Sequence, residues 1–161
     1  MRPRRLLPAL IAAFAFAAPA FAQPQGYWAV AEAPDGIKLG IIFPDYSPNE
    51  FAGLGFVCSP GVETTQGWSD VGKGLRGGAR TTVVIEAGGA PARYAARAER
   101  SEMDDGVRAA FVTTLADPIF DDLAAAQALK VGVGKSASQL TTRGAAKAVN
   151  AFRVKCRVAG E

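Results

Sequence analysis

Residues 1–22 constrain this chain more than any other part of it, because they determine which residues fold and in which compartment. Three arginines among the first five residues precede an apolar stretch, residues 6–18, that is too short for a stable transmembrane helix. Residues 20–22, Ala-Phe-Ala, then have the small-x-small pattern that signal peptidase accepts. We therefore expect residues 1–22 to be a cleaved signal peptide and the mature protein, beginning at Gln23, to be periplasmic or secreted.

Residues 23–161 have the size of a single domain and carry no net charge. Of the 18 Lys and Arg residues, three lie in the predicted signal peptide, which leaves 15 basic residues against 15 acidic ones. This balance gives no electrostatic basis for binding nucleic acid or an anionic membrane surface. No second apolar run has the length of a transmembrane helix, so we expect no membrane span after cleavage. The composition, rich in alanine and arginine and without histidine, favours a bacterial envelope protein.

Two cysteines remain after cleavage, Cys58 and Cys156. In an oxidising compartment, such a pair predicts one disulfide. It would close a loop of nearly a hundred residues and stabilise the fold by at most about 4–5 kcal/mol. Two free thiols with a redox or metal role are the alternative, which the lack of a CxxC spacing and of histidine disfavours.

The hydrophobic pattern predicts an α+β fold that is mainly β, an antiparallel β-sandwich or barrel with two helices packed on it. Apolar and polar residues alternate most clearly over 92–100 and 107–115, and the turn residues Asp104-Asp105-Gly106 between them indicate a hairpin. Residues 60–79 are rich in glycine and are expected to be irregular. Further strands are expected over 27–32, 37–43, 51–59, 80–86, 129–133 and 139–142.

The two helices are expected at about 117–127 and 144–156. Asp117 provides a side-chain N-cap, and Pro118 follows at the first helical position, where its missing N–H has no cost. In the second segment, apolar residues recur at intervals of four, three and four, so they share one helical face. Cys156 ends this apolar stripe, and the predicted disulfide would therefore join this helix to the strand that contains Cys58.

Two glycine-rich motifs resemble nucleotide-binding loops but lack the necessary context. Residues 72–77 match GxGxxG, yet a strand and not a helix is expected to follow them. Residues 134–136, Gly-Lys-Ser, end like a P-loop, but Leu129 occupies the position of its first glycine. We therefore predict no cofactor.

The residue types of the chain and their spacing also give little support for a catalytic function. Without histidine, no Ser-His-Asp triad and no imidazole metal site can form. A Ser-Lys pair remains possible because Ser136 and Ser138 flank Lys135, although this segment is expected to be an exposed turn. The carboxylate pairs Asp104-Asp105 and Asp121-Asp122 have no ligand spacing of a known calcium loop, and the first is expected in a turn. We predict no catalytic residue and no metal site.

Aromatic residues provide the candidate binding surface. Most of those in the first third of the mature chain fall within strand patterns and are expected in the core. Tyr46 and Trp68 fall in segments that look like loops, where exposed aromatic side chains often anchor a partner. Core packing is an equally good interpretation of Trp68.

The C-terminal run ALKVGVGKSASQLTTRGAAKAVNAFRVKC, residues 128–156, consists of a strand, a short strand, a glycine and an alanine-rich helix that ends at a cysteine. It resembles the tail of the invasion-associated locus B family of small exported alphaproteobacterial proteins, in which a strand and a glycine lead into a short final helix. The resemblance covers about a quarter of the mature chain. It implies a periplasmic or secreted β-rich domain without known catalysis, and it assigns no functional residue.

Together these observations favour a non-catalytic binding module of the bacterial envelope, with an envelope or extracellular protein as its partner. An envelope hydrolase that uses carboxylates or a Ser-Lys pair is one alternative. A carrier of a small apolar ligand, held in a cavity between the strands, is another.

Overall fold

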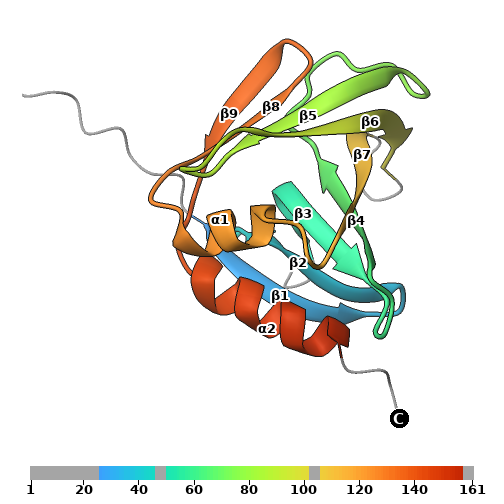
Figure 1. Cartoon of the computed structure of the whole chain (residues 1–161). Helices are drawn as coiled ribbons and strands as arrows, with labels where there is room; N and C mark the ends of the chain where they lie inside the picture. Colours follow the sequence, from blue (N-terminus) through green and yellow to red (C-terminus); the bar gives the residue numbers. More distant parts are fainter. Residues whose placement is uncertain (1–25, 46–49, 102–105, 158–161) are drawn as a thin grey trace, which may run out of the picture.

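The computed structural model describes residues 26–45, 50–101 and 106–157 of the chain (Figure 1). The predicted signal peptide, Tyr46 and the Asp104-Asp105 pair lie outside these residues. None of the helices among the described residues is long and apolar enough to cross a membrane.

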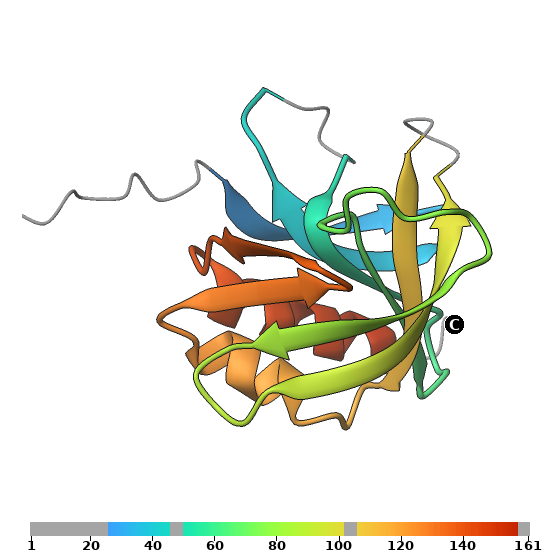
Figure 2. The ribbon, with the colours of Figure 1, turned by 90° about the horizontal axis from the view of Figure 1, so that it is seen from above.

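Nine strands form one antiparallel sheet in the order β1-β2-β3-β4-β7-β6-β5-β8-β9. The sheet curls strongly but does not close, as the two perpendicular views show (Figures 1 and 2). Its strands are β1 (Tyr27–Ala33), β2 (Gly36–Ile42), β3 (Ala52–Cys58), β4 (Thr64–Ser69), β5 (Arg80–Glu86), β6 (Ala92–Arg100), β7 (Val107–Thr114), β8 (Leu129–Val133) and β9 (Ser136–Leu140). The predicted antiparallel, mainly β fold with two helices is confirmed.

Strand β4 is the one strand that the sequence did not predict, because its apolar pattern is inverted. Its buried positions are occupied by the small residues Thr65, Gly67 and Ser69. Gly67 is required there, since a Cβ atom would lie 2.2 Å from the Phe111 ring on the neighbouring strand β7. The large residue of β4, Trp68, points to the opposite face. A strand with small polar residues inside and an aromatic residue outside resembles a loop in sequence.

The helices α1 (Ile119–Ala125) and α2 (Ala145–Arg157) cover one face of the sheet, which we call the inner face. Figure 1 shows α2 alongside β1 and β2, with α1 next to it. Four phenylalanine rings link the layers, with centroid distances of 6.0 Å from Phe56 to Phe111, 5.0 Å from Phe56 to Phe120 and 5.8 Å from Phe120 to Phe152. Because these rings contact one another across β3, β7 and both helices, the domain has one continuous core.

Both helices begin and end close to the predicted positions. The Asp117 carboxylate accepts a hydrogen bond from the Ile119 N–H at 2.9 Å and another from the Thr113 hydroxyl at 2.5 Å. It therefore satisfies a backbone donor at the start of α1, as an N-cap residue does. Gly144 precedes α2 with a φ of 79°, a value that a residue with a Cβ rarely adopts.

The disulfide between Cys58 of β3 and Cys156 of α2 is present, as predicted. Both cysteines are buried, and their Cα atoms are 6.0 Å apart. Near the other end of α2, the Trp28 indole N–H donates to the Thr141 carbonyl at 2.8 Å, and the Trp28 backbone N–H donates to the Arg143 carbonyl at 2.9 Å. The helix is thus attached near both of its ends to the first three strands.

Replacing both cysteines, Cys58→Ala together with Cys156→Ala, is expected to lower the free energy of unfolding by up to about 4–5 kcal/mol. The physical reason is that the disulfide links residues 98 positions apart and so restricts the unfolded chain. Urea denaturation of the mature chain, followed by circular dichroism, measures the difference. Reduction of the wild-type disulfide serves as the matched control and should destabilise the fold to a similar extent. An unchanged urea midpoint in both cases would contradict the prediction.

Two ion pairs also hold α2, Arg153 with Asp121 of α1 at 2.5 Å and Lys155 with Glu32 of β1. The hydrogen bond from each cation lowers the pKa of Asp121 and of Glu32 below the usual values of 3.8 and 4.5. Each pair therefore stabilises the fold above those usual values, and this contribution is lost as the pH falls through the lower pKa of the folded state. Both carboxylates are exposed, so the effect is small.

We expect Asp121→Asn to lower the urea midpoint slightly at neutral pH and to have a smaller effect at about pH 2, because protonation of Asp121 removes the ion pair as the pH falls through its lowered pKa. Urea titrations of the variant and the wild type at the two pH values test this. A difference of the same size at both pH values would show that the ion pair is not its cause.

Candidate functional site

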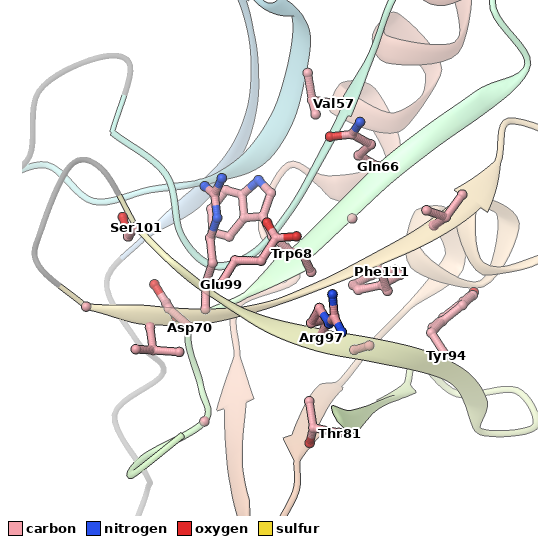
Figure 3. A pocket seen from close by; sticks show the side chains of 18 of the residues that line it. Val57, Gln66, Trp68, Asp70, Thr81, Tyr94, Arg97, Glu99, Ser101 and Phe111 are labelled. Carbon is pink, nitrogen blue, oxygen red and sulfur yellow. The ribbon is translucent and has the colours of Figure 1, made fainter. Parts of the chain in front are cut away.

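A large cleft lies on the outer face of the sheet, the face opposite the helices, and has a volume of about 1390 Å³. Residues of β3, β4, β6 and β7 form its floor, and residues of β2 and β5 extend it at its two ends. Figure 3 shows Gln66 and Trp68 of β4 together with Arg97 and Glu99 of β6 along this cleft. The cleft is an open surface feature and not a cavity enclosed between the strands.

Trp68 lies in this cleft, on strand β4 and not in a loop. The sequence prediction of a loop for this residue is therefore corrected, whereas its predicted role in binding stays a prediction. The indole covers Gly55, its cross-strand neighbour on β3, so closely that a Cβ at Gly55 would lie 2.3 Å from the ring atom Cζ2. Trp68 is half-buried as a result, with part of its ring exposed in the cleft. The absence of a side chain at Gly55 thus fixes how the tryptophan lies.

Arg108 of β7 packs against the indole ring of Trp68. Its guanidinium carbon is 5.9 Å from the centre of the Trp68 ring, within the range of a cation–π interaction. The Arg108 Nε atom is buried and has no hydrogen-bond acceptor among the described residues. A buried N–H without an acceptor costs about 1–3 kcal/mol.

The charges of the cleft are unevenly distributed. Near the β1–β2 turn, Lys38 forms an ion pair with Asp35 at 3.0 Å. Asp70 accepts a hydrogen bond from the Gly53 N–H at 2.8 Å. The part of the cleft on β5, β6 and β7 is dominated by arginines and contains one carboxylate, Glu99; its arginines are Arg80, Arg93, Arg97 and Arg108.

These arginines were not among the site residues predicted from the sequence. The alternation in residues 92–100 does place Arg93, Arg97 and Glu99 on one face of a strand, but such a pattern is typical of any solvent-exposed face. The contribution of β4 was hidden as well, because that strand was not predicted. Only the register of β4, β7, β6 and β5 shows that Trp68 and the arginines share one surface.

Tyr94 of β6 is a structural residue beside the cleft. Its ring stacks on Phe111 with a centroid distance of 4.7 Å. Burial, together with the nearby Asp117 carboxylate, raises the pKa of the Tyr94 hydroxyl well above its ordinary value of 10. The hydroxyl therefore remains protonated at physiological pH, and it provides no base or nucleophile.

The remaining motifs occupy connections and surfaces. The GxGxxG match, residues 72–77, lies in the loop before strand β5, as predicted. Gly134 and Lys135 form the turn between β8 and β9, and the Ser136 hydroxyl accepts a hydrogen bond from the Lys73 N–H at 3.1 Å.

Within the part of the chain that the structure describes, no group of three or more carboxylate or cysteine side chains could hold a metal ion. Tyr46 lies outside that part, so its proximity to Trp68 stays a prediction.

No family model matches the chain, and neither a curated protein nor a solved structure is significantly similar to it.

The variant Gly55→Ala tests whether Gly55 positions the indole. Because the added methyl group would overlap the ring, we expect Trp68 to move away from the sheet, with an increase in its accessibility to an aqueous fluorescence quencher. The second tryptophan, Trp28, is buried and contributes a constant background. Gly67→Ala is the matched control on the inner face, where overlap with Phe111 should lower stability by about 1–3 kcal/mol. Unchanged quenching in Gly55→Ala would show that Gly55 does not determine the position of the ring.

Proposed function

We propose that this chain is an exported, periplasmic or secreted, non-catalytic module of the bacterial envelope that binds a protein through the cleft on its outer face. The observation that carries this proposal is the placement of Trp68, held between Gly55 and Arg108 on the floor of a large open cleft. Tryptophan and arginine are the residues that most often dominate the energy of protein interfaces. A rigid sheet presents both here at little cost in conformational entropy.

The disulfide supports the export part of the proposal. Such bonds form and persist in oxidising compartments, including the bacterial periplasm and the extracellular medium. The predicted signal peptide and the resemblance to exported alphaproteobacterial proteins point to the same compartments.

The two alternatives have less support. A Ser-Lys hydrolase requires a buried lysine, whereas Lys135 is exposed in a hairpin turn, and the Ser136 hydroxyl is engaged by a backbone N–H. A carrier of an apolar ligand requires space between the sheet and the helices. Among the described residues, that space is filled by a continuous cluster of side chains, and the large cleft described above lies on the outer face.

The test is affinity capture from the cell envelope with disulfide-bonded protein that begins at Gln23. We expect one stoichiometric protein partner, and we expect Trp68→Ala to weaken its binding by about tenfold or more, since a central aromatic anchor is lost. The variant Tyr46→Ala, alone and combined with Trp68→Ala, tests whether the second predicted residue contributes.

Val154→Ala is the control variant, because Val154 is an exposed apolar residue on α2, on the other side of the sheet. It should capture the partner as well as the wild type does. Equal losses in Trp68→Ala and Val154→Ala, or no partner at all, would contradict the proposal.

A further inference from the structure

We propose that the partner segment that occupies the cleft is acidic, and that its carboxylates bind to Arg80, Arg97 and Arg108. This inference rests on the proposed function, and it specifies the chemistry of the protein that the cleft recognises. It is carried by two observations: a directly opposed arginine pair, and the engagement of most of the nearby carboxylates among the described residues.

Arg80 of β5 and Arg97 of β6 are direct cross-strand neighbours on the outer face. In such a pair the Cβ atoms are about 4.5–5.5 Å apart, and like charges at that separation destabilise a sheet. Both side chains are exposed, and among the described residues no carboxylate forms an ion pair with either. An anion between the two guanidinium groups would convert this repulsion into attraction.

Arg108 extends the arginine pair toward Trp68. Arg97 and Trp68 share the same cross-strand neighbour, Ala110 of β7, and Arg108 lies two residues before Ala110 on the same face. The three arginines therefore lie on three adjacent strands, across about 10 Å of sheet. The Nε atom of Arg108 is buried, so a carboxylate of the partner would bind the terminal nitrogen atoms of this half-buried guanidinium group.

The acidic residues of the cleft do not neutralise this group. Asp35 is paired with Lys38, and Glu50 and Asp70 have interactions of their own. Glu99 is the cross-strand neighbour of Arg108, but the two are not within ion-pair distance. Among the described residues that line the cleft on β5, β6 and β7, there is one carboxylate for four arginines, Arg93 included, which leaves an excess of positive charge.

The size and chemistry of the cleft favour a protein segment over a small anion. Its volume of about 1390 Å³ exceeds the range of about 300–1,000 Å³ that is usual for small-molecule pockets. Arginine binds carboxylates through two parallel hydrogen bonds, and several carboxylates along one extended segment could engage the arginines at once. The exposed part of Trp68 would then contact an apolar residue next to the acidic ones.

The experiment measures binding of a fluorescent poly-L-glutamate peptide to disulfide-bonded protein that begins at Gln23, by fluorescence anisotropy at low and at physiological salt. We expect the double variant Arg80→Gln/Arg97→Gln to bind the peptide about tenfold or more weakly than the wild type. The matched control is Lys147→Gln/Arg157→Gln, which removes the same net charge from exposed positions of α2. This control should bind within about twofold of the wild type. Circular dichroism and urea midpoints confirm that both variants fold.

Three results would overturn the inference. One is an equal loss of peptide binding in the two double variants, which would indicate a response to net charge alone. Another is arginine-dependent binding of polygalacturonate without binding of the peptide, which would assign the cleft to an acidic glycan. The third is a captured envelope partner that is lost in Trp68→Ala but retained fully in Arg80→Gln/Arg97→Gln. This last result would leave the proposed function intact, whereas capture of no partner by any form would contradict the proposed function itself.

Discussion

The fold depends on covering the inner face of its open sheet. Because the curled sheet does not close on itself, other elements must shield the apolar residues of that face from water. Helices α1 and α2 provide that cover, and Phe120 and Phe152 extend the aromatic contacts of Phe56 and Phe111 through both helices. The short α1 packs against α2, and α2 is attached by the disulfide near one end and by the strand β1 near the other. Release of α2 would remove Val149, Phe152 and the other buried residues of this helix from the core, so the attachments of one helix contribute to the stability of the whole domain.

Around strand β4, an aromatic ring packs over a glycine on each face of the sheet. On the inner face, Gly67 leaves space for the ring of Phe111, and on the outer face Gly55 of the neighbouring strand leaves space for the ring of Trp68. Each aromatic ring therefore occupies the space that a Cβ atom on the neighbouring strand would otherwise fill. The inner ring joins the core, and the outer ring remains partly exposed. The same arrangement, an aromatic ring packed over a glycine of the neighbouring strand, stabilises the core on one face and forms a candidate binding surface on the other.

The local features of the fold and one residue of the candidate site, Trp68, could be predicted from the sequence, whereas the rest of the site could not. The hairpin of β6 and β7 follows from strict alternation, and α1 follows from the Asp117 cap, because each signal lies within a few adjacent residues. Strand β4 was not predicted, since Thr65 and Ser69 occupy buried positions where apolar residues are usual. The cleft depends on the register between strands. Arg80, Arg97 and Trp68 lie on three different strands, and no two of them are adjacent in the sequence. Tertiary pairing alone brings them together.

The disulfide and the cleft are connected through β3. Cys58 ends that strand, and Gly55, which positions the indole of Trp68, lies three residues before it. Covalent attachment of β3 to α2 therefore holds the strand on which Trp68 rests, while the register between β3 and β4 holds Trp68 itself. A surface fixed in this way loses little conformational freedom when a partner binds. The bond that stabilises the exported domain thus also preorganises the surface through which we propose that it binds.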